Sequence, residues 1–137
     1  MSRLLKFLPV ILGKVKFGFS SAEVGNVDAS TVAVVFSQGV HASNYATGVT
    51  ITVAGAGATI STATRQSNTK VVYFALSAPV ITGQAVTFAY NSGPGDYTNL
   101  AASEDLPTIP SRNVTNNLGG SSMAGYAMGV LGLTYSN

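Results

Sequence analysis

Short stretches in which apolar and polar residues alternate recur along the middle of the chain. In residues 31–37, Val32, Val34 and Phe36 fall on one face of an extended strand, and the residues between them fall on the other. A period of two is typical of strands that bury one face. The pattern predicts seven strands, at residues 17–24, 31–37, 50–54, 58–64, 70–76, 85–90 and 109–115.

Turn-forming residues separate these stretches at intervals of roughly ten to fifteen residues, close to the spacing of a β-sandwich. Valine, isoleucine and threonine, which favour strands over helices, supply 35 of the 137 residues. We therefore expect an all-β fold, a Greek-key β-sandwich of about seven strands. The apolar strand faces predict the core residues Val34, Phe36, Ile51, Phe74, Leu76, Val86 and Phe88.

Charge divides the chain into a basic arm and a mildly acidic body. The first sixteen residues contain Arg3, Lys6, Lys14 and Lys16 and no acid, whereas the rest has three basic and five acidic residues, a net charge of −2. Binding of nucleic acid by such a body is not expected, because no basic face supplies phosphate contacts. The arm either favours an acidic partner surface or is a solvated terminus. A cleavable signal peptide is not expected, since Pro9 interrupts the apolar run and no small-residue cleavage site follows.

The C-terminal region has a linker composition followed by an apolar segment. Residues 118–122 read Leu-Gly-Gly-Ser-Ser, and residues 123–133 are apolar, with Gly125 and Gly129 at GxxxG spacing. Eleven residues are too few for a membrane-spanning helix, which needs about 20. The predicted organisation is an N-terminal arm (1–16), a sandwich (17–117) and a C-terminal arm (118–137). The residues expected to bind a partner are Arg3, Lys6, Lys14, Lys16, Met123, Tyr126, Met128, Leu131 and Leu133.

Several strand and turn patterns resemble bacterial immunoglobulin-like repeats, which occur in bacterial surface proteins and phage structural proteins. The resemblance covers about residues 17–117 and lies in residues 21–24, 31–40, 78–90 and 114–116. It implies an Ig-like Greek-key sandwich, here with extended N- and C-terminal arms. The matching motifs are strands and turns without catalytic groups. Such repeats normally stand in tandem, so the resemblance implies that the partner of this single copy is another protein chain.

The residue types needed for catalysis are sparse. There is no cysteine, and His41 is the single histidine, expected in a loop, so neither a nucleophilic triad nor a thiolate metal site is predicted. Asp96, Glu104 and Asp105 could bind Ca²⁺, but a solvated acidic loop is the favoured interpretation. The sequon at Asn113 falls in a predicted strand and is interpreted as structural. We expect no enzymatic activity and no cofactor.

Two classes of function remain. The favoured one is a non-enzymatic structural protein, such as a phage capsid decoration protein in the virion, attached through its terminal arms to other chains, including copies of itself. The alternative is an extracellular or cell-surface module, adhesin-like or carbohydrate-binding, that uses its loops. Tyr45 and Tyr97 are the tyrosines expected in those loops, where aromatic rings could stack on sugars.

Overall fold

The computed structural model describes residues 16–119, and all its regular elements are strands. The ten strands are β1 (Phe19–Val24), β2 (Thr31–Phe36), β3 (Val40–His41), β4 (Val49–Val53), β5 (Ala56–Gly57), β6 (Ile60–Arg65), β7 (Val71–Leu76), β8 (Val86–Tyr90), β9 (Thr98–Asn99) and β10 (Ile109–Asn116). The all-β expectation is confirmed.

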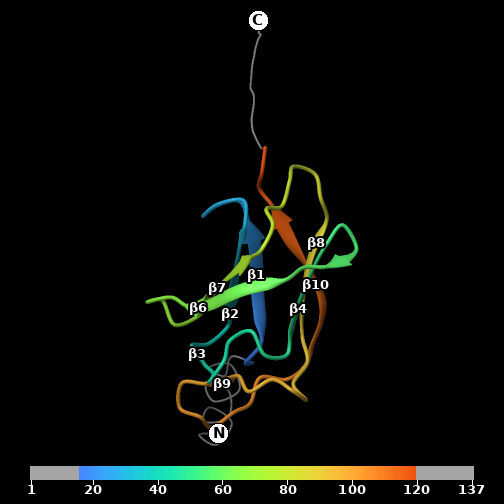
Figure 1. Cartoon of the computed structure of the whole chain (residues 1–137). Helices are drawn as coiled ribbons and strands as arrows, with labels where there is room; N and C mark the ends of the chain where they lie inside the picture. The colour runs from blue at the N-terminus through green and yellow to red at the C-terminus, as the bar shows by residue number, and fades with distance from the viewer. Residues whose placement is uncertain (1–15, 120–137) are drawn as a thin grey trace, which may run out of the picture.

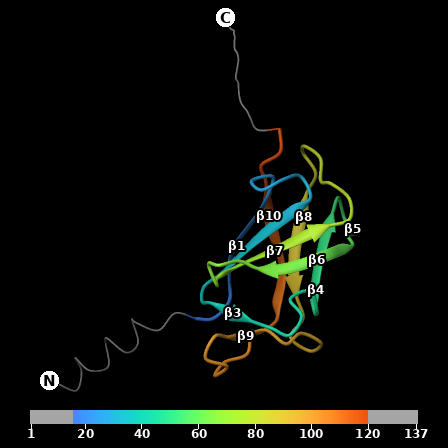
Figure 2. The same ribbon diagram turned by 60° about the vertical axis from the view of Figure 1, so that its left-hand side comes forward.

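Eight of the strands form one sheet in the order β5-β4-β8-β10-β1-β2-β7-β6, and β3 and β9 form a separate pair. The sheet curls, so that its two halves face each other across one core (Figures 1 and 2). The ring of Phe88 on β8 lies 6.3 Å from that of Phe36 on β2 and 5.8 Å from that of Phe74 on β7. These contacts join the two halves of the sheet.

The buried core follows the alternation in the sequence. Along β2, β7 and β8 every second side chain is buried, and the antiparallel register places Val32 beside Phe74 and Val34 beside Val72. A one-residue shift of register would turn these side chains to solvent, so burial of one face fixes the pairing. All seven predicted core residues are buried, none more than 5% exposed.

The seven strands of five or more residues lie where the pattern predicts them, with ends displaced by at most two residues. The sequence did not predict β3, β5 or β9, because two residues are too few to show alternation. Ala56 and Gly57 of β5, for example, lie in a segment that reads as a turn but pair with Val53 and Thr52 of β4.

The chain enters and leaves the described body at opposite ends. β1 and β10 pair in parallel through Glu23 with Thr115 and Val24 with Asn116. The start of β1 therefore lies toward the end that carries β3 and β9, and the end of β10 lies at the far end (Figure 1). Leu118, expected as the first linker residue, is half-buried and packs against the core.

Candidate functional site

The end of the body that carries β3 and β9 contains the longest connection, residues 91–108 between β8 and β10. This connection pairs with the chain after β2, Val40 with Asn99 and His41 with Thr98. It is also held by its own side chains, since the Asn99 side-chain oxygen accepts hydrogen bonds from the backbone N–H groups of Ser103 (3.0 Å) and Glu104 (3.3 Å). The loop that the sequence offers as a binding loop is thus an internally bonded structure.

Three tyrosines gather beneath this connection. Tyr97 is only 1% exposed, and its ring lies 5.2 Å from the ring of Tyr90 and 5.5 Å from that of Tyr45. Its hydroxyl donates a hydrogen bond to the Tyr45 carbonyl oxygen (2.7 Å), and its backbone N–H donates one to the Tyr90 hydroxyl (3.1 Å). Burial, the largest cause, raises the pKa of Tyr97 far above its usual value. Tyr97 does lie in a loop, as predicted, but the expectation that its ring is available to a sugar is wrong, because the side chain is buried in the core.

Glycine allows the connection to approach these rings closely. A Cβ atom at position 95 would collide with the ring of Tyr90, which is itself buried. Gly48 has a φ of 83°, and a Cβ atom there would lie 2.7 Å from the carbonyl oxygen of Asn91. Both positions favour glycine for local steric reasons.

A hollow of about 460 Å³ opens beside the tyrosines and is lined by Asp96 and Asp105 among others. Asp96 accepts a hydrogen bond from the backbone N–H of Ser43 (3.1 Å), which ties the connection to the chain after β3. Burial raises the pKa of Tyr90, and the two carboxylates raise it further. Glu104 does not line the hollow, and within residues 16–119 there is no group of three or more histidine, cysteine, aspartate or glutamate side chains that could hold a metal ion. The arrangement brings two of the three candidate carboxylates together at one hollow.

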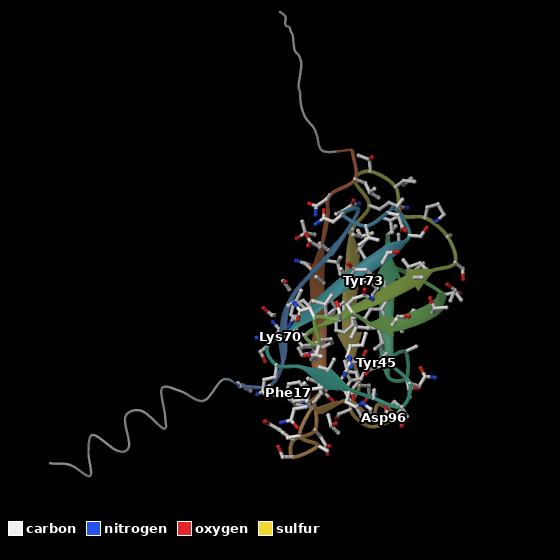
Figure 3. The ribbon with its side chains drawn as sticks, turned by 90° about the vertical axis from the view of Figure 1, so that its left-hand side faces the viewer. Phe17, Tyr45, Lys70, Tyr73 and Asp96 are labelled. Atoms are coloured by element: carbon white, nitrogen blue, oxygen red, sulfur yellow. The ribbon has the colours of Figure 1, made fainter. Side chains whose placement is uncertain are left out.

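The remaining single candidates occupy edges and surfaces. His41, expected in a loop, lies in the short strand β3, with its side chain exposed. Asn113 lies in β10, as predicted, and is exposed. Figure 3 shows Tyr45, Asp96 and Phe17 toward the same end of the body, with Tyr73 farther along it.

Of the nine residues expected to bind a partner, the structure describes Lys16. Its side chain is exposed, and its carbonyl oxygen accepts a hydrogen bond from the Ser37 hydroxyl (2.6 Å). The next residue, Phe17, is fully buried, so the arm joins the body at a fixed point beside β2. The other eight lie outside the described residues: Arg3, Lys6, Lys14, Met123, Tyr126, Met128, Leu131 and Leu133. No helix capable of crossing a membrane is found in the described part of the chain.

Comparison with protein-family models and with curated proteins found no match. Two solved structures of S-layer proteins have a similar fold. The crystal structure of the S-layer protein rSbsC(31-844) matches 81% of this chain with a TM-score of 0.64 at 13% identity. The crystal structure of the N-terminal part of the bacterial S-layer protein SbsC matches 82% with a TM-score of 0.61 at 11% identity. The chain spans only 15% and 26% of those two chains, so the likeness is to one part of each.

Proposed function

We propose that this chain is a non-enzymatic structural module of a protein assembly at the cell surface, joined to other chains, including its own copies, through its two ends. The observation that carries the proposal is the parallel pairing of β1 and β10, which makes the chain run through the body from one end to the other. A module of this kind can be connected in series without reversing the chain. The shared fold with parts of bacterial S-layer proteins supports the same role.

We propose that the fold is an Ig-like Greek-key sandwich, as the resemblance to bacterial immunoglobulin-like repeats implies. One half of the curled sheet has the order β1-β2-β7-β6, and the other has β10-β8-β4-β5. This arrangement agrees with the distribution of strands between the two sheets of immunoglobulin-type domains. The agreement in strand order supports the resemblance of this chain to immunoglobulin-like repeats, and with it a role in contact between proteins.

The chemistry of the loop end supports a structural role over a catalytic one. The Tyr97 hydroxyl, the Asp96 carboxylate and the Asn99 side chain all bond to other parts of the same loops. Catalysis needs an acid, a base or a nucleophile held ready for a substrate. Here the polar groups serve the fold.

Two settings remain for the assembly. The cell-surface setting has the support of the S-layer neighbours, whereas the phage virion stays a prediction from the sequence resemblance. The adhesin-like or carbohydrate-binding module is the second candidate function. It is favoured by the hollow beside Tyr90, whose lining includes the exposed carboxylates of Asp96 and Asp105.

Sedimentation velocity of the full chain over a range of concentrations tests the proposal. We expect multimers that grow with concentration and that persist in the Asp96→Asn variant. Lys14→Glu should weaken them, and added salt should reduce the effect of that substitution, because exposed charges are screened beyond about 8–10 Å. Lys70→Glu, an equal charge change at an exposed site on the body, is the control. A chain that stays monomeric yet binds glycans, and loses this binding in Asp96→Asn, would support the adhesin-like function instead.

A further inference from the structure

β1 and β10 are paired at one end only. Their parallel pairing covers Glu23 with Thr115 and Val24 with Asn116. At the same register Phe19 would lie beside Ser111, but the pairing does not extend that far. A hollow of about 330 Å³ opens here, lined by residues 16–19 on one side and by residues 107–110 and Arg112 on the other. We call this opening, between residues 16–19 and 107–112, the seam.

The seam leaves part of the sandwich uncovered. Residues 110–113 of β10 are exposed, and the pairing of β10 with β8 occupies only its other edge. Phe19 is half-buried and stacks at 5.8 Å on Phe88, so the rim of the core reaches the surface at the seam. Unpaired strand edges bind added strands through their free backbone groups. Since Pro110 has no N–H to donate, the stretch of β10 open to pairing is residues 111–113.

Charge selects which segment fits the seam. Lys16 and Arg112 line the hollow, and no acidic residue does. The chain has two apolar segments outside the described body, one in the N-terminal arm and one in residues 123–133. The arm carries Arg3, Lys6 and Lys14, which the seam would repel, whereas residues 120–137 contain no charged side chain. The uncharged segment is the better occupant.

The sequence of that segment also suits a strand laid over a groove. Large side chains at Tyr126, Met128 and Val130 alternate with small residues at positions 125, 127 and 129. As an extended strand, this stretch would turn its large side chains to one face and its small ones to the other. Eleven extended residues reach about 36 Å, longer than the eight residues of β10.

We propose that residues 123–133 of a second copy bind in the seam as an added strand, with Tyr126, Met128 and Val130 facing Phe19 and Ile109. The C-terminal arm, which contains residues 123–133 and which we call the tail, leaves the body at the end of β10. The seam, in contrast, opens at the start of β10. In copies joined in series, the tail of one therefore meets the seam of the next. This inference rests on the proposed function and names the surface through which the series forms.

Disulfide trapping in the full chain tests the inference. Because the chain has no native cysteine, every disulfide formed must involve the introduced cysteines. Three double variants combine Ser111→Cys with Gly125→Cys, Ala127→Cys or Gly129→Cys, which covers the possible registers. Mild oxidation should give a ladder of linked multimers in at least one of them. The matched controls combine Thr64→Cys, at an exposed position on the edge strand β6, with each of the same three tail cysteines. We expect their ladders to be at least about tenfold weaker, and Met128→Asp should reduce the seam ladder by a similar factor because it removes an apolar side chain from the interface.

Each other outcome overturns the inference. A disulfide within one monomer would place the tail in the seam of its own chain. Equally strong ladders from the Ser111→Cys and Thr64→Cys variants would show that the tail contacts the body non-specifically. If none of the three tail positions forms a disulfide with position 111, the seam is not the binding site. If sedimentation still shows multimers in that case, the proposed function stands and the contact lies elsewhere. If the chain does not associate, both fail.

Discussion

Phe88 is the side chain through which the two halves of the sheet are most directly joined. It is fully buried and its ring contacts those of Phe19, Phe36 and Phe74 at 5.8, 6.3 and 5.8 Å. Phe-to-Ala changes in a core cost about 3–5 kcal/mol, and each aromatic pair adds roughly 0.5–1.5 kcal/mol beyond burial. We expect Phe88→Ala to lie at the upper end, about 4–5 kcal/mol. Phe36→Ala and Phe74→Ala should cost about 3–5 kcal/mol each.

Urea unfolding followed by circular dichroism measures this loss. With a slope of about 1.5 kcal/mol per molar urea, a loss of 4.5 kcal/mol lowers the midpoint by about 3 M. Because a domain of this size has a total stability of about 5–15 kcal/mol, Phe88→Leu, which keeps most of the volume, provides a folded variant with a smaller loss. Val27→Ala, at a side chain that is 47% exposed, is the control and should stay within about 0.5 kcal/mol. If Phe88→Ala cost no more than this control, the packing of the two halves described above would be wrong.

Three further predictions concern the loop end. Tyr97→Phe should cost about 1–2 kcal/mol in the same urea assay, because it leaves the Tyr45 carbonyl without its donor; an unchanged midpoint would contradict the buried hydrogen bond. Since the folded-state pKa of Tyr97 is raised, its neutral form stabilises the fold fully below pH ~10, and stability should fall by up to ~1.4 kcal/mol per pH unit above that value. A pH titration of stability should show a shallower alkaline fall in Tyr97→Phe, and equal slopes would refute this. Gly48→Ala should cost at least about 2 kcal/mol through its positive φ and its approach to Asn91, whereas Gly57→Ala, with no neighbour within 4 Å, should be nearly neutral.

The strands and the core could be predicted because burial of one face leaves a direct record in the sequence. Val34 and Phe74 follow a period of two, and each is buried as that period requires. Ala56 and Gly57 carry no such record, since they pair only through their backbone. Strands of two residues are determined by what lies beside them.

The surroundings of the candidate side chains could not be predicted in the same way. Tyr97 lies in a segment rich in turn residues, which favours exposure, but the connection folds back and buries it against Tyr90 and Tyr45. The contact of Asp96 with Ser43 spans 53 positions of the chain. Neither the segment around Asp96 nor the segment around Ser43 has an alternation of apolar and polar residues from which their contact could be predicted. Gly48 and Gly95 are the residues in the sequence that could have indicated this packing. Glycine is favoured where another part of the chain approaches the backbone closely, as Asn91 approaches Gly48 and the Tyr90 ring approaches Gly95.

Small-angle X-ray scattering of the full chain at increasing concentration tests the central claim most directly. If copies join in series through opposite ends of the body, the maximum dimension should grow with concentration while the radius of the cross-section stays that of one body. Met128→Asp should shorten these particles at equal concentration if the seam is the contact. A maximum dimension that does not change with concentration, or growth in the cross-section instead of the length, would contradict the account.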